Sequence, residues 1–154
     1  MKSGVGNILL LSFEAATNDE CMVATTLALG TSTSFNTTLA TACTTIPYPT
    51  CSLGDAGSNT DDAWFTFTPA NGGFVHFLTC NGSFNTMMAI YMGSCGGSLT
   101  QQACNNDAGG SCTVSAINLV VATGTTHFVR IGGFAGQFYF FGQSGVSNIL
   151  LSFL

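Results

Sequence analysis

The chain has 154 residues, which is enough for one domain with a sizeable core, and only 6% of them are charged. Lys2 and Arg130 are its only basic residues, and the formal net charge is −5. So few cations cannot neutralise a row of phosphates or form a positive patch, which excludes nucleic acid and anionic lipid surfaces as partners. The neutral polar residues that remain predict a surface covered by other subunits or by sugar.

The first predicted element is an apolar strand, "SGVGNILLLSF", at residues 3–13, and the sequence nearly repeats it as "SGVSNILLSF" at residues 144–153. Its apolar run is shorter than the core of a signal peptide, and no stretch reaches the roughly 18 residues of a membrane span, so no membrane insertion is expected. Apolar residues on both faces indicate a strand enclosed by protein. The predicted assembly residues are Ile8, Leu9, Leu10, Leu11 and Phe13.

The middle of the chain reads as short strands separated by Asn, Gly, Asp and Ser clusters at intervals of roughly ten residues. In residues 63–69, Ala63, Phe65 and Phe67 lie on one face of the predicted strand. Trp64, Thr66 and Thr68 lie on the other face. Similar runs occupy residues 72–80, 85–93, 115–124 and 125–133. The one plausible helix, residues 19–29, is weakened by its threonines. This pattern predicts an all-β, antiparallel sandwich.

Seven cysteines indicate an oxidising compartment, extracellular or at the cell surface. Cys43 and Cys51 bracket a proline-containing loop, and we expect them to form a disulfide. Cys95 and Cys104 likewise enclose a turn, although Cys112 competes for Cys104. The odd thiol would then be Cys21 or Cys80. The spacing does not fit a zinc site.

No catalytic residue is predicted, and we expect the protein not to be an enzyme. His76 and His127 lie in strand patterns without a nucleophile elbow, so they are interpreted as packing residues. Two Gly-rich loops carry the carboxylates of Asp61, Asp62 and Asp107, which makes calcium possible. Asp is also an ordinary turn residue, and no cofactor is required.

Two Asn-x-Ser/Thr sequons, at Asn36 and Asn81, are the candidate glycosylation sites. Both stand in turn-like sequence, where a glycan would be accessible. Glycans would also explain how a surface with so few charges stays hydrated.

Five stretches together resemble bacterial pre-peptidase C-terminal domains: "NDEC" (18–21), "DDAWFTFTP" (61–69), "TCNGSFNTMMAIYMGSCG" (79–96), "ACNND" (103–107) and "GTTHFVRIGGFAG" (124–136). The chain departs from the family pattern at "CNND", at His127, where a Tyr is usual, and at "QFYFF" (137–141). The resemblance implies a jelly-roll-like β-sandwich over residues 18–154. In tandem members of the family, one domain's last strand precedes the next domain, so residues 1–17 would be a strand and connector that belong to a neighbour.

These observations lead to two functional hypotheses. The first is a structural subunit of an extracellular filament or surface array, a homo-oligomer joined head-to-tail by exchange of the N-terminal strand. The alternative is an accessory module of a secreted enzyme that binds carbohydrate or matrix. An accessory module would be expected to carry a charged surface and has no need of a second terminal strand, so the first hypothesis is preferred.

Overall fold

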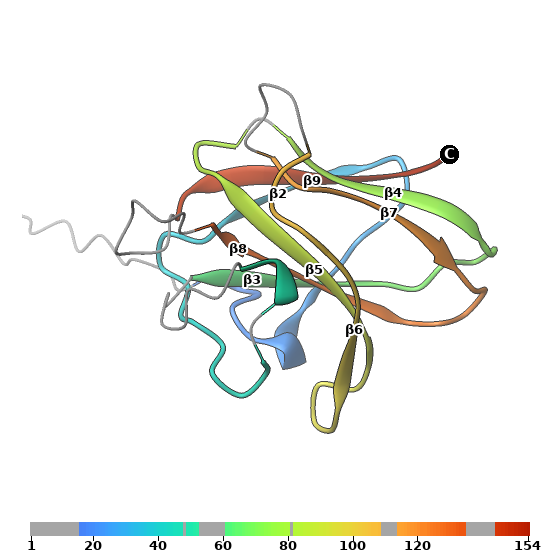
Figure 1. The fold of residues 1–154 in the computed structure, drawn as a ribbon, viewed down its shortest axis with the longest axis horizontal. Helices are drawn as coiled ribbons and strands as arrows, with labels where there is room; N and C mark the ends of the chain where they lie inside the picture. Colours follow the sequence, from blue (N-terminus) through green and yellow to red (C-terminus); the bar gives the residue numbers. More distant parts are fainter. Residues whose placement is uncertain (1–15, 48, 53–60, 81, 109–113, 135–143) are drawn as a thin grey trace, which may run out of the picture.

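The computed structural model describes residues 16–47, 49–52, 61–80, 82–108, 114–134 and 144–154, and it confirms an all-β sandwich (Figure 1). One sheet has five strands in the order β1-β3-β8-β5-β6, and the other has four in the order β2-β9-β4-β7. The strands are β1 (Thr25–Thr26), β2 (Ser32–Asn36), β3 (Asp62–Phe67), β4 (Gly73–Cys80), β5 (Thr86–Gly93), β6 (Leu99–Asn105), β7 (Ala116–Val121), β8 (His127–Gly133) and β9 (Val146–Phe153).

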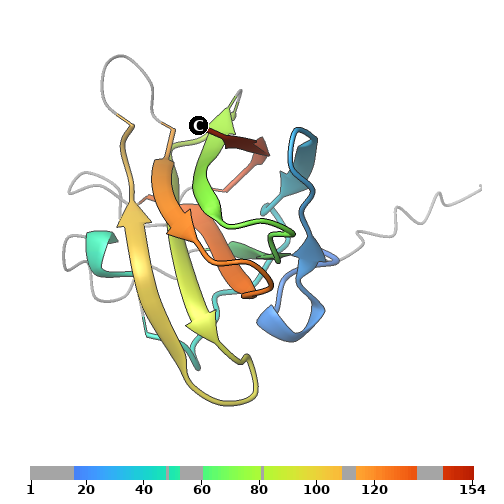
Figure 2. The ribbon, with the colours of Figure 1, turned by 90° about the vertical axis from the view of Figure 1, so that its right-hand side faces the viewer.

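Edge strands of both sheets lie at the same side of the sandwich. In Figure 2 the blue segment that carries β1 and β2 lies on one side of the molecule, and the gold β6 lies on the opposite side. Strand β1 pairs in parallel with β3, whereas the other described pairings are antiparallel. The β1–β2 side is therefore where the two layers end together.

The predicted alternation places the core between the sheets. Ala63, Phe65 and Phe67 of β3 face inward with Phe77 of β4 and Ile149 of β9, and all five are buried. Burial of such apolar side chains is the main favourable term in folding, at about 1.5–3 kcal/mol for each large one. The sandwich predicted from the strand patterns is thus the one observed.

The predicted helix at residues 19–29 is wrong. A short 3-10 helix, η1 (Cys21–Val23), is followed directly by β1. The β-branched residues Thr25 and Thr26 pair with Phe65 and Thr66 of β3, and this pairing outweighs the weak helical pattern.

A second layer covers the outer face of the five-stranded sheet. It consists of residues 40–47 and 49–52, here called the cap segment, which ends in the 3-10 helix η2 (Thr50–Ser52). Trp64 and Tyr91 point outward from the sheet, yet both are buried beneath this layer, with Ile46 packed against them. The Thr50 main-chain N–H donates to the Gln101 Oε1 atom at 3.1 Å. The sheet therefore has hydrophobic contacts on both faces.

The described residues form two disulfides, neither of them predicted, and one of the two, Cys51–Cys104, attaches the cap segment to β6. Cys21 bonds to Cys95 and Cys51 bonds to Cys104, with Cα–Cα distances of 5.6 and 5.8 Å. Cys43 is a buried free thiol. The predicted Cys43–Cys51 bridge, the Cys95–Cys104 pairing and the free thiol at Cys21 are therefore wrong.

Sheet geometry explains these errors. Cys95 lies in the hairpin turn just before β6, which begins at Leu99. Cys104 lies five residues farther along β6, about 16 Å from Leu99 at 3.3 Å per residue. That is beyond the Cα separation that a disulfide spans. The Cys43 carbonyl accepts from Arg130 on β8, whereas Cys51 bonds to β6, two strand positions away. Short loops in the sequence were thus a poor guide to distance.

The outer face of the four-stranded sheet is bare by comparison. Outward positions on β4 and β7 include Phe74, which is 55% exposed, and Val120, which is 65% exposed. The two outer faces of one sandwich therefore differ in whether the chain covers them.

Candidate assembly site

The five predicted assembly residues, Ile8 to Phe13, lie outside the described residues, so their role stays a prediction. Their near-identical copy is described. It forms β9, which lies between β2 and β4 in the four-stranded sheet. Ile149 and Leu151 are buried in the core, and Leu150 between them is half-buried on the other face. A sequence of this kind therefore forms an interior strand that pairs with β2.

Among the described strands, β2 is an edge of that sheet. Its inner side pairs with β9, from Ser32 opposite Leu150 to Asn36 opposite Val146. No described strand lies on its outer side. In the same register the Thr37 N–H donates to the Gly145 carbonyl at 2.9 Å. Because antiparallel hydrogen-bonded pairs alternate, the N–H of Ser34 then points away from β9 and toward the open side.

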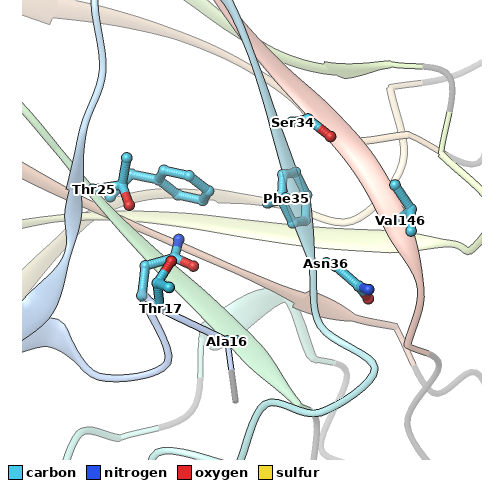
Figure 3. Close-up of a pocket in the computed structure, with 9 residues that line it drawn as sticks. Ala16, Thr17, Thr25, Ser34, Phe35, Asn36 and Val146 are labelled. Atoms are coloured by element: carbon cyan, nitrogen blue, oxygen red, sulfur yellow. The ribbon is translucent and has the colours of Figure 1, made fainter. Parts of the chain in front are cut away.

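A pocket of about 400 Å³ lies beside this edge, between β1 and β2 (Figure 3). Figure 3 shows Phe35 on β2 and Thr25 on β1 on opposite sides of it, with Ala16 and Thr17 at one end. The residues that line it are Ala16, Thr17, Asn18, Thr25, Ser34, Phe35, Asn36, Phe65 and Val146.

The pocket has an aromatic floor and a neutral polar rim. The rings of Phe35 and Phe65 meet edge to face with 5.5 Å between their centroids. On the rim, Asn18 Nδ2 donates to the Trp64 carbonyl at 3.0 Å, and the Trp64 N–H donates back to the Asn18 carbonyl at 2.7 Å. No charged side chain is among the lining residues. Such a site suits apolar side chains presented by an extended peptide, because only hydrogen bonds and apolar contacts are available.

Asn36, one of the two candidate glycosylation sites, is exposed at the end of β2 and lines the same pocket. Its Oδ1 atom accepts from the Thr38 N–H at 2.9 Å. The other candidate, Asn81, lies outside the described residues. Whether either carries sugar stays a prediction.

The predicted calcium ligands are not brought together. Asp62 is fully buried beneath the cap segment, where its carboxylate accepts from the Arg130 Nε atom at 2.7 Å and from the Trp64 Nε1 atom at 2.9 Å. Asp61 precedes β3, and Asp107 is exposed after β6. Among the described residues, no group of three or more His, Cys, Asp or Glu side chains could hold a metal ion.

The role of Asp62 is instead an ion pair on the covered face. Arg130 Nη2 lies 2.5 Å from Asp62 Oδ2 and also donates to the Cys43 carbonyl at 3.2 Å. Burial raises the pKa of Asp62 to about 6, and the nearby Arg130 guanidinium opposes that rise. Sequence reasoning missed this pair. The signal was a single Arg inside an apolar strand, in a chain with one other basic residue.

The two histidines occupy strands, as predicted. His76 lies in β4, and its Nδ1 atom is 2.5 Å from Asn118 Oδ1 of β7. His127 begins β8 and faces the core, where burial lowers its pKa.

Comparison with known proteins concerns the fold. No family model matches the sequence, and no curated protein matches it either. Among solved structures, it is similar to the pre-peptidase C-terminal domain of a collagenase from Bacillus anthracis, with a TM-score of 0.51 and 11% identity over 83% of this chain and 93% of that one. The chain has the fold of a pre-peptidase C-terminal domain. At this identity the likeness does not extend to activity.

Two further observations bear on where such a domain operates. The paired cysteines fit an oxidising environment, as found outside the cytoplasm. Within the described ranges, no helix has the length and apolar character of a membrane span.

Proposed function

We propose that this chain is a structural subunit of an extracellular filament, in which the N-terminal strand of one copy adds to β2 of the next. The observation that supports this most is the uncharged edge of β2 beside a pocket with an aromatic floor and a neutral polar rim, next to Ala16, to which residues 1–15 are joined. Strand addition at such an edge uses main-chain hydrogen bonds for affinity and side-chain pockets for register.

The repeated sequence suits this edge. β9 carries the same sequence, and it already occupies the interior position beside β2. The N-terminal copy must therefore find another site, and the outer side of β2 is open to it. Alternate residues of an added strand would face the pocket floor at Phe35 and Phe65, and the others would extend the outer face of the sheet.

Strand direction favours a neighbouring copy over the chain's own β2. In Figure 3 Ala16 lies toward the Asn36 end of β2. Because residues 1–15 end at Ala16, a strand lying along its own β2 would run toward the Asn36 end, as β2 does, and would be parallel to it; β9, with the same sequence, pairs antiparallel. A strand donated by another subunit is free to take the antiparallel direction. Such a contact is head-to-tail and does not close, so it generates a fibre.

Proline at position 34 tests the edge in the full chain. Ser34→Pro removes an outward N–H and leaves the bonds between β2 and β9 intact, since proline is tolerated where the N–H faces outward. Ser34→Ala is the matched control, because it keeps the N–H. We expect filaments in electron micrographs of the wild type and of Ser34→Ala, and single subunits for Ser34→Pro. Unchanged filaments for Ser34→Pro would contradict the proposal.

Deletion of residues 1–13 distinguishes donation of the N-terminal strand to a neighbour from pairing of that strand within its own domain. Donation to a neighbour predicts a folded domain that no longer assembles. It also predicts that a synthetic peptide of residues 3–13 binds the domain with 1:1 stoichiometry. An intramolecular strand instead predicts a monomeric full chain and a destabilised truncation. Calorimetry of the truncated domain and peptide titration distinguish these results.

The second candidate is an accessory module that binds carbohydrate or matrix. The observation that favours it is the likeness to a domain of a collagenase. It predicts binding of the monomeric protein to insoluble collagen or polysaccharide in a pull-down, without any filament. Binding that survives Ser34→Pro while filaments are absent from the wild type would favour this candidate.

A further inference from the structure

The outer face of the four-stranded sheet carries no charge. Each outward position on β2, β9, β4 and β7 holds an apolar residue, a Ser, an Asn or His76. Phe74 and Val120 lie directly opposite each other on β4 and β7, and both are more than half exposed. Leu78 and Leu150 form a second apolar pair across β4 and β9. Between them, His76 and Asn118 bond to each other.

This face differs from its counterpart on the other side of the molecule. Outward residues of the five-stranded sheet, such as Trp64 and Tyr91, are buried beneath the cap segment, which the Cys51–Cys104 disulfide joins to β6. Within the described part of the chain, nothing comparable covers Phe74 and Val120, which are more than half exposed. An exposed apolar patch bounded by neutral polar groups is characteristic of an interaction surface.

No described Asp or Glu lies on a strand of the four-stranded sheet. Asp19 and Glu20 precede η1, Asp61 precedes β3, and Asp107 follows β6. Asp62 is buried and paired with Arg130. Two copies of an acidic chain repel each other, and this sheet is the surface on which they can meet without opposing carboxylates.

We propose that the outer face of the four-stranded sheet is a contact surface between copies of this chain, packed face to face. Its polar residues both donate and accept hydrogen bonds, so two identical faces can satisfy one another. Face-to-face sheets pack about 10 Å apart with interdigitating side chains, which suits the alternating rows of this surface.

The size of the face indicates how the contact operates. Four strands about 4.8 Å apart, with five to eight residues of about 3.3 Å each, give roughly 400 Å² per copy. The total is below the roughly 1,200 Å² of a stable interface, so an isolated pair of subunits is held weakly. Repetition along a filament makes many such contacts act together. In that respect the inference rests on the proposed function: the face would join filaments side by side.

The test places charge on the face in the full chain. Phe74→Asp with Val120→Asp introduces two carboxylates there, and Met22→Asp with Val23→Asp introduces two at exposed apolar positions on η1, away from the sheet. We expect the wild type and the η1 variant to form bundles in micrographs. The face variant should form single filaments, with at least a tenfold rise in the concentration at which bundles sediment. Circular dichroism checks that both variants are folded.

Other outcomes decide against the contact surface or against the filament. Bundles in the face variant, or their loss in both variants, would overturn the surface. If the wild type forms no filaments, the proposed function fails, and the surface is tested by NMR dilution of the monomer. Concentration-dependent shifts at His76 and Asn118, which both proteins retain, would still support it if they are absent from the face variant. Shifts caused only by an added polysaccharide would overturn it.

Discussion

The two outer faces of the sandwich differ in whether the described chain covers their outward side chains. Outward side chains of β3, β5 and β8 are covered by the chain itself, and beneath that cover lies an ion pair between Asp62 and Arg130. Outward side chains of β4 and β7 remain exposed. The comparison suggests that stability depends on the covered face, whereas the bare face is available for the proposed contacts between copies. Four predictions test this division.

The largest effect is expected from the buried cation. Arg130→Met leaves the Asp62 carboxylate buried without its partner, which should lower the free energy of unfolding by about 3–5 kcal/mol. His76→Met is the control at an outward position of β4, and its effect should stay within about 0.5 kcal/mol. Urea unfolding under oxidising conditions measures both. Equal losses of unfolding free energy in the two variants would contradict the proposed difference between the faces.

Removal of the Cys51–Cys104 disulfide should be next in size. With Cys51→Ala and Cys104→Ala, we expect a loss of about 2–4 kcal/mol, and the bridge between Cys21 and Cys95 remains. Amide hydrogen exchange should accelerate in the cap segment and stay slow in β4 and β9, because the cap is held at this point. Uniform acceleration across both sheets would show that the cap is not a separate layer.

The covered face should also carry a pH dependence. The folded-state pKa of Asp62, about 6, is above the ordinary value of 3.8, so the folded protein binds a proton here that the unfolded chain does not. The stability gained from this proton is full below pH 3.8 and is lost as pH rises through about 6, by up to about 3 kcal/mol. The difference between wild-type and Asp62→Asn unfolding free energies, measured from pH 4 to 7, should show this slope. Buried His127 contributes the opposite slope in both proteins and cancels. A flat difference contradicts the prediction.

The smallest effect is expected on the bare face. Phe74→Thr should change the free energy of unfolding by less than about 0.5 kcal/mol, since the ring is already 55% exposed. Thermal melting of the isolated subunit measures it. A loss above 2 kcal/mol would mean that Phe74 contributes to the fold and is not merely available for contacts.

Periodicity in the sequence was sufficient to predict the sandwich. Alternation at Ala63, Phe65 and Phe67 depends only on the two-residue repeat of a strand, and the structure places those side chains in the core as expected. The final strand was predicted differently, from its apolar run, its near-repeat of residues 3–13 and the resemblance to tandem domains, and the structure forms it as β9.

Features of the covered face could not be predicted in this way, because they join residues far apart in the chain. Asp62 and Arg130 meet only once β3 lies beside β8, and Cys51 reaches Cys104 only once the cap folds over β6. Trp64 is a further example. Alternation places it on the face opposite Phe65, which local patterns would leave exposed, and the cap segment buries it. The open edge of β2 depends on the order of strands in the sheet, which local patterns do not contain.

The bond between Cys21 and Cys95 also has a mechanical consequence. When an oxidised subunit is pulled at its two chain ends, tension enters the domain just before Cys21 and crosses directly to Cys95. The sequence separation of 74 residues between these cysteines is thereby removed from the length that can extend. At about 3.5 Å per residue, this withholds roughly 250 Å of chain from unravelling under load. An oxidised subunit would therefore extend far less under load than its number of residues suggests. Reduction of the Cys21–Cys95 disulfide would make those residues extensible.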